Sequence, residues 1–222
     1  MRLLAVDTAL QRLSVAIGEG GEVRAARSIP LPRGHAERLL PFAAEVLDDA
    51  GLGYPDLDAL AVTLGPGTFT GVRVGLAAVR ALALALARPV IGFTTLQVLA
   101  VQARPAPDET VLALLDARRD EVYAQAFDHD IRPLAEPRIL ALDDIAGALP
   151  TGPTVVVGTG IRPLRERLPA GLRRARAAIA PEAAHMIGLA HRLDLRGGPS
   201  PAPVYLRRPD AKLPGGKMPS ET

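Results

Sequence analysis

Two aspartates stand where a carboxylate at the end of a strand could do chemistry. Asp7-Thr8 follows the apolar residues 3–6, and Asp116-Ala117 follows the apolar residues 111–115. In two-lobed ATPases, such carboxylates hold a metal–nucleotide complex between the lobes. Aspartate also favours turns, because its side chain accepts hydrogen bonds from nearby backbone. From these residues alone, the turn explanation is favoured over a nucleotide site.

A glycine-rich segment offers a second place for a phosphate. In Gly65-Pro66-Gly67-Thr68-Phe69-Thr70-Gly71, glycines would let backbone N–H groups approach an anion at a helix start. However, Val72 stands where a P-loop has lysine, and Thr70 stands where a dinucleotide fold has its third glycine. We therefore expect a tight strand-to-helix turn that needs glycine dihedrals. The remaining weak candidates for nucleotide contact are Asp7, Thr8, Gly65, Gly67 and Asp116.

Other residue types exclude several classes of site. The chain has no cysteine, so thiol catalysis, disulfides and cysteine-based zinc sites are ruled out. Its four histidines lack ligand spacing, and no serine lies in a Gly-x-Ser-x-Gly elbow. The 26 Lys and Arg nearly balance the 24 Asp and Glu, and aromatic residues make up only 3%, so nothing indicates a nucleic-acid surface. The apolar start is too short for a signal sequence and Arg80 splits the longest apolar run, so we expect a soluble, cytoplasmic protein with no membrane association.

The elements that must position these residues repeat along the chain. Hydrophobic periodicity predicts strands at 3–6, 13–17, 22–29, 57–64 and 89–93, with helices over 35–50 and 71–87. After a proline-containing linker at 104–107, the pattern of strand, Asp turn and strand restarts, with strands at 111–115, 121–127, 137–140 and 154–157 and helices at 143–149, 163–168 and 181–195. Two similar hairpins can arise by chance, but the order favours a duplicated α/β unit. We expect an N-terminal lobe over 1–103, a C-terminal lobe over 104–207 and a flexible tail over 208–222.

The helix over 71–87 is apolar on almost every face. Its only charged residues, Arg73 and Arg80, are seven apart and therefore lie on one side. Such a helix must be covered on more than one side, by its own sheet and by either a neighbouring helix or a second subunit. We favour the second subunit, with the helix over 35–50 sharing the interface. The predicted interface residues are Leu39, Ala43, Val46, Arg73, Leu76, Arg80 and Leu84.

Several segments together resemble the bacterial TsaB family. They are Asp7-Thr8, Gly34-His35-Ala36-Glu37-Arg38-Leu39-Leu40-Pro41, Gly65-Pro66-Gly67-Thr68-Phe69-Thr70-Gly71-Val72-Arg73-Val74-Gly75, Asp116-Ala117-Arg118-Arg119-Asp120-Glu121-Val122-Tyr123-Ala124 and Pro203-Val204-Tyr205-Leu206-Arg207. Their order and spacing hold over nearly the whole chain, and the combination is highly specific. The sequence departs from the family at Thr68, where Ser is commoner, and at Gly158-Thr159-Gly160, where Gly-Asp-Gly is usual.

The resemblance implies a fold, a pathway and partners. The implied fold is α/β, with duplicated ribonuclease-H-like units in the two lobes of an actin/hexokinase-like ATPase (ASKHA). The implied role is accessory, in making threonylcarbamoyladenosine beside the anticodon of tRNA. The implied partners are the catalytic paralogue TsaD and the ATPase TsaE, with a homodimer when the chain is alone and only indirect contact with tRNA.

The resemblance also implies that this chain is not itself an enzyme. The paralogue binds a metal through a His-x-x-x-His segment, whereas residues 93–100 here contain no histidine. We therefore expect no catalytic residues, no metal and no cofactor, with at most a weak ATP or ADP contact in the complex. The alternatives are an ATPase or small-molecule kinase that uses Asp7, Thr8 and Asp116, and a metallopeptidase.

Overall fold

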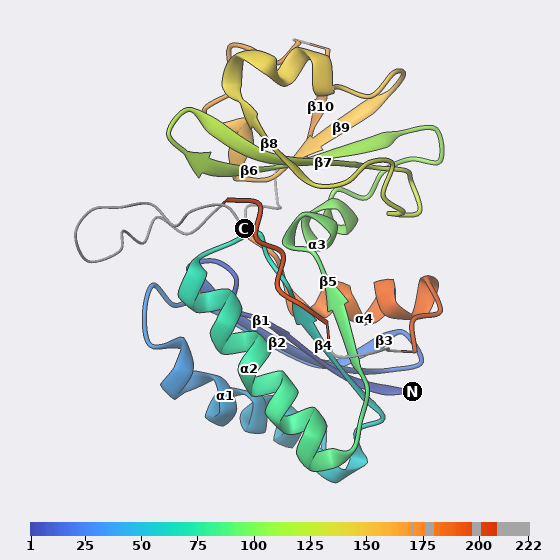
Figure 1. Cartoon of the computed structure of the whole chain (residues 1–222). Helices are drawn as coiled ribbons and strands as arrows, with labels where there is room; N and C mark the ends of the chain where they lie inside the picture. Colours follow the sequence, from blue (N-terminus) through green and yellow to red (C-terminus); the bar gives the residue numbers. More distant parts are fainter. Residues whose placement is uncertain (170, 176–179, 197–200, 208–222) are drawn as a thin grey trace, which may run out of the picture.

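Two five-stranded sheets organise the chain in the computed structural model, which describes residues 1–169, 171–175, 180–196 and 201–207 (Figure 1). The first sheet has the order β3-β2-β1-β4-β5 and contains β1 (Arg2–Asp7), β2 (Arg12–Glu19), β3 (Glu22–Pro30), β4 (Ala59–Thr63) and β5 (Val90–Phe93). The second has the order β10-β9-β6-β7-β8 and contains β6 (Thr110–Arg118), β7 (Glu121–Phe127), β8 (Arg138–Ala141), β9 (Thr154–Val157) and β10 (Arg173–Arg174).

The two sheets share one topology, which confirms the predicted duplication. In each sheet, the first strand of the unit pairs antiparallel with the second and parallel with the fourth. In each, the third strand lies antiparallel at one edge and the fifth parallel at the other. The unit is therefore a three-stranded meander extended by two parallel crossover strands.

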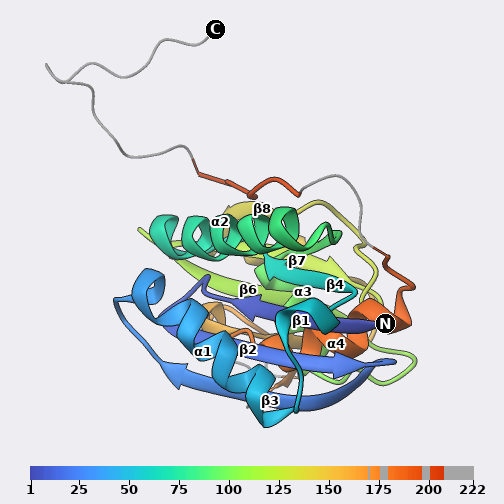
Figure 2. The same cartoon turned by 90° about the horizontal axis from the view of Figure 1, so that it is seen from below.

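The central strands of the first sheet are buried on both faces, whereas β3 at its edge is mostly exposed. Leu4, Val6 and their neighbours on β2 and β4 point towards α1 (His35–Asp49) and α2 (Phe69–Leu86), which cover one face (Figure 2). Leu3 and Ala5 point to the opposite face. This explains why β1 reads as a continuous apolar run rather than as an alternating one. The loop before α2 places Thr68 as its N-cap, with the side chain accepting the Gly71 N–H at 3.1 Å.

The space between the sheets is filled by two helices that cross between the lobes. α3 (Thr95–Gln102) follows the first sheet in sequence but packs against β6 and β7 of the second. α4 (Ala183–Arg192) follows the second sheet but packs against β1, β2 and β3 of the first. Together they form one apolar cluster, here called the interlobe core, that includes Ala5, Phe93 and Val111. The predicted lobe boundary at 103/104 remains a prediction. α3 lies before this boundary and α4 after it, and each packs against the sheet of the other lobe.

Several predicted elements differ from the observed ones. Residues 163–168 form turns instead of a helix, the predicted helix at 143–149 is the 3-10 helix η2 (Leu142–Ala148), and α3 and β10 were not predicted. α3 lacks an amphipathic period because five of its eight residues, from both sides of the helix, are buried. Two further short 3-10 helices are η1 (Tyr54–Asp56) and η3 (Thr159–Ile161). The predicted tail at 208–222 lies outside the described residues.

Candidate functional site

The glycine-rich loop fits directly onto the turn that follows β1. Thr68 N–H donates to the Ala9 carbonyl at 2.7 Å, and the Thr8 hydroxyl donates to the Gly71 carbonyl at 2.8 Å. A Cβ at Gly71 would lie 2.1 Å from the Thr8 carbonyl oxygen, and one at Gly67 would lie 2.3 Å from the Ala9 carbonyl oxygen. The two segments are thus packed backbone against backbone.

This packing corrects the predicted reason for the glycines. Gly65 alone among the loop glycines has a positive φ, of 97°. Gly67 and Gly71 are required because no side chain fits between the loop and the turn. Gly75, one turn after Gly71, is required too, because a Cβ there would lie 2.3 Å from the Thr8 hydroxyl oxygen. Close approach rather than dihedral freedom therefore explains the spacing of these three glycines.

Asp7 lies beneath this junction with its side chain fully buried. Its Oδ1 accepts the Thr63 hydroxyl at 2.6 Å and the Ala9 N–H at 3.3 Å, whereas its Oδ2 has no hydrogen-bond partner among the described residues. Burial raises the pKa of Asp7 from 3.8 to about 7, because the two hydrogen bonds and the charge of Arg12 offset only part of the desolvation. Near neutral pH, a large part of the population therefore carries an uncharged acid here.

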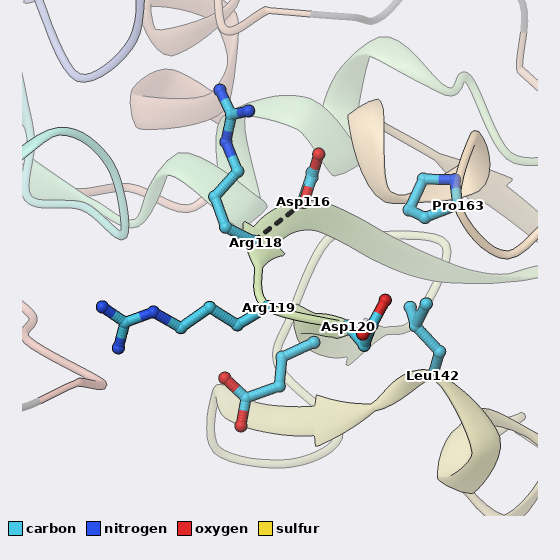
Figure 3. A pocket seen from close by; sticks show the side chains of 7 residues that line it. Asp116, Arg118, Arg119, Asp120, Leu142 and Pro163 are labelled. Carbon is cyan, nitrogen blue, oxygen red and sulfur yellow. Dashed lines mark hydrogen bonds between the residues drawn. The ribbon is translucent and has the colours of Figure 1, made fainter.

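The second lobe has a related junction at Asp116. The Asp116 Oδ1 accepts the Arg118 N–H at 2.8 Å (Figure 3). The Asp116 N–H donates to the Thr159 hydroxyl at 3.1 Å. Gly158 has a φ of 104°, and a Cβ there would lie 2.1 Å from the Leu114 carbonyl oxygen. Both aspartates accept an N–H two residues later, which is the hydrogen bond that the turn explanation expects.

Unlike Asp7, Asp116 borders a cavity of about 240 Å³ and is partly exposed. The lining residues are Asp116, Arg118, Arg119, Asp120, Glu121, Leu142 and Pro163 (Figure 3). All belong to the second lobe, so Asp7 and the glycine-rich loop do not line this cavity. Among the described residues, no group of three His, Cys, Asp or Glu side chains could hold a metal ion. The two predicted aspartates thus do not share one described cavity.

The structure divides the seven predicted interface residues into two groups. Leu39, Ala43, Val46 and Leu76 are at most 4% exposed and pack in the core between the first sheet and its helices, so they cannot reach a partner. This corrects the prediction, which assigned them to the interface because the periodicity alone does not show which apolar face meets the sheet. Arg73, Arg80 and Leu84 are exposed, with Leu84 at 86%.

The exposed side of α2 carries mostly apolar residues between its two arginines. Ala77, Ala81 and Ala85 accompany Leu84 there, and α2 has no acidic residue. α2 is also the one described helix long and apolar enough to cross a membrane by length and composition, and a third of that window is buried within the chain. Sequence reasoning missed the aromatic residues at its start, Phe69 and the contacting Tyr205, which are 48% and 45% exposed.

Comparison with known proteins gives consistent matches. The sequence model of the family described as TsaD: tRNA N6-adenosine threonylcarbamoyltransferase matches residues 31–161. A tRNA threonylcarbamoyladenosine biosynthesis protein TsaB from Escherichia coli is 42% identical over 59% of this chain and 56% of that protein. The alignments to curated TsaB proteins therefore span about half of their length.

Solved structures extend the likeness over the whole fold. YeaZ from Pseudomonas aeruginosa is 35% identical, covers 92% of this chain and 99% of its own, and superposes with a TM-score of 0.81. A ROK hexokinase from Thermus thermophilus superposes with a TM-score of 0.51 over 89% of this chain and 100% of its own at 15% identity. The second likeness confirms the predicted two-lobed actin/hexokinase-like fold and carries no further conclusion.

Proposed function

This chain belongs to the TsaB family, and we propose that it is a non-catalytic scaffold subunit in threonylcarbamoylation of the adenosine beside the anticodon of tRNA. In this proposal, the chain binds the catalytic paralogue TsaD, and the ATPase TsaE joins the pair. The observation that carries the proposal is that the chain's own β1–β2 turn fills the glycine-rich loop of the first lobe.

The filled loop has consequences for phosphate binding. A glycine-rich loop holds phosphate through free backbone N–H groups. Here the Thr68 N–H donates to the Ala9 carbonyl, and the Gly71 N–H donates to the Thr68 hydroxyl. Both N–H groups are therefore engaged within the chain, and a phosphate could reach them only by displacing these hydrogen bonds. This favours a scaffold over an ATPase or kinase in which Asp7 and Thr8 contact nucleotide.

The state of Asp7 supports the same assignment. A carboxylate that holds a metal–nucleotide complex must be ionised and able to reach the ion. The Asp7 carboxyl is fully buried, and its pKa is raised to about 7 by that burial. A group in this state suits a structural role beneath the junction better than a metal-binding role.

The interlobe core supports a rigid rather than a moving molecule. Enzymes of two-lobed folds commonly use domain closure to sequester their substrates. In this chain, α3 and α4 fill the space between the sheets with fully buried side chains such as Leu99 and Met186. Separating the lobes would expose these side chains at about 25 cal/mol per Å² of apolar surface. A fixed arrangement is what a docking scaffold requires.

The docking surface in this proposal is the exposed side of α2. An 86% exposed leucine among small residues is an apolar surface that a helix of a partner could cover closely. We therefore expect Leu84→Glu to abolish co-purification with TsaD while leaving the free chain folded. Leu134→Glu is the matched control, because Leu134 is 54% exposed but lies in the second lobe. Leu76→Glu should instead unfold the chain, since Leu76 is buried.

Reconstitution of tRNA modification tests the proposed function directly. Purified TsaD, TsaE and the enzyme that makes threonylcarbamoyl-adenylate would be assayed with this chain, without it and with the Leu84→Glu variant. The Leu134→Glu control would be assayed in the same way, and we expect modification only with the parent chain and with this control. Undiminished modification without this chain would refute the proposal.

A nucleotide-binding function is the second candidate, because Asp116 borders a partly open cavity with Arg118 at its edge. Titration calorimetry of the isolated chain with magnesium–ATP tests it. Sub-millimolar binding that is lost in Asp116→Ala would favour that function over the scaffold.

A further inference from the structure

The segment 201–207, here called the strap, lies alongside α2 and is bonded to both lobes (Figures 1 and 2). Val204 N–H donates to the Leu64 carbonyl at 2.8 Å, which attaches the strap to the end of β4. Arg207 donates to the Ala117 carbonyl at 2.8 Å and pairs with Glu121, which attaches it to the second lobe. The strap is thus fixed at its middle and at its end.

The strap also contacts the two arginines on the exposed side of α2. Arg73 Nε donates to the Tyr205 hydroxyl at 2.8 Å, and an Arg80 terminal nitrogen donates to the Pro201 carbonyl. The Arg73 guanidinium also lies 3.5 Å from the centroid of the Phe69 ring. The Phe69 and Tyr205 ring centroids are 6.0 Å apart. Arg73 is therefore held by a hydrogen bond on one side and a ring on another.

This arrangement leaves a defined part of Arg73 for a ligand. A guanidinium has five N–H donors in one plane, and the bond to Tyr205 uses the one on Nε. The terminal nitrogens of Arg73 make no hydrogen bond to the described residues, and the side chain is exposed. A fixed guanidinium of this kind suits a carboxylate, which it can bind through two parallel hydrogen bonds.

Resting on the docking function proposed above, we propose that Tyr205 is a positioning residue for the interface: it orients Arg73 to receive a carboxylate of the catalytic paralogue. The charge distribution supports a carboxylate as the occupant. Neither α2 nor the strap contains an acidic residue, so every charged side chain on the surface they form is positive. An exposed arginine with free rotation would lose more side-chain entropy on binding than one already held.

A double-mutant cycle tests the positioning role. The dissociation constant of the complex with TsaD would be measured by calorimetry for the parent chain, Tyr205→Phe, Arg73→Ala and the double variant. We expect Arg73→Ala to weaken binding about 30-fold and Tyr205→Phe about 5-fold. Because Tyr205 acts through Arg73, the double variant should bind no more weakly than Arg73→Ala alone. Independent, multiplying effects would overturn the inference.

A measurement on the free chain tests the positioning role of Tyr205 independently of the docking function. NMR relaxation should show a high order parameter for the Arg73 Nε–H bond in the parent chain and a lower one in Tyr205→Phe. Tyr123→Phe is the matched control, because Tyr123 lies in β7 and contacts the interlobe core instead. An Arg73 that stays equally ordered in Tyr205→Phe would overturn the positioning role, whatever the partner does. Normal binding by Arg73→Ala together with lost binding by Leu84→Glu would overturn the carboxylate assignment alone, whereas normal binding by both would refute the docking surface itself.

Discussion

Replacing Asp7 with asparagine should change how the stability of the chain depends on pH. Burial raises the pKa of Asp7 to about 7 in the folded state, whereas the ordinary aspartate value of 3.8 applies in the unfolded chain. Between these values the folded state holds a proton that the unfolded state has lost. The protonated Asp7 therefore contributes its full stability to the fold below about pH 4, and this contribution is lost as the pH rises through about 7.

The magnitude follows from the size of the shift. Each pH unit between the two pKa values changes the free energy of unfolding by about 1.4 kcal/mol. The parent chain should thus lose about 2 kcal/mol between about pH 5 and pH 7 through Asp7 alone, because the slope falls to half as the pH reaches the folded-state pKa. Asparagine has no proton to lose, so the variant should lack this part of the slope. Its amide nitrogen adds a cost where Asp7 Oδ2 has no partner, but that cost is the same at every pH.

Urea unfolding of both proteins across this pH range measures the difference. Only the change in the gap between the two curves matters, because other titrating groups affect both proteins alike. Asp116→Asn serves as the matched control, since Asp116 accepts the same kind of turn hydrogen bond in the second lobe but is partly exposed. Parallel curves for the parent and Asp7→Asn would show that the buried carboxyl is ionised in the fold, and the reasoning about Asp7 would be wrong.

Three further outcomes are expected. Gly71→Ala should lower the free energy of unfolding by about 3 kcal/mol or prevent folding, because its Cβ would clash with the Thr8 carbonyl. The control Gly147→Ala has open space around it and should lower the free energy of unfolding, measured with urea, by less than about 1 kcal/mol. A hydrogen bond from Arg173 lowers the pKa of Glu109 to about 2, so this ion pair should stabilise the fold above about pH 4.5 and lose its effect as the pH falls towards 2; an acid titration of Arg173→Ala should lack that loss. The isolated chain should sediment as a dimer and Leu84→Glu as a monomer, and a parent chain that sediments as a monomer at all concentrations would contradict the predicted self-association.

The duplicated fold could be predicted from sequence because its signals are local. β1 and β6 each contain a continuous apolar run that is followed by an aspartate, and α1 has a clear amphipathic period. The family motifs then place these elements within a two-lobed fold. α3 gives no such signal, since a short helix buried on both sides has the same apolar composition as a strand.

The candidate site was less predictable because its contacts join distant parts of the chain. The sequence shows the spacing of Gly67, Gly71 and Gly75 but not that the turn after β1 lies against them. It shows that α2 is apolar but not that Leu76 faces inward and Leu84 outward. The hydrogen bond between Arg73 and Tyr205 spans 132 residues, and no local pattern indicates it. Depth of burial and long-range packing decide these points.

Because α3 and α4 each pack against the sheet of the other lobe, the order of synthesis also determines when the chain can fold. During synthesis, the first sheet emerges well before α4, so the face formed by Leu3, Ala5 and Ala16 has no cover until residue 192 has left the ribosome. The first half should therefore not become stable on its own, and chaperones would meet it as an exposed apolar sheet. A fragment of residues 1–103 should aggregate, and adding residues 104–207 in trans should rescue its solubility.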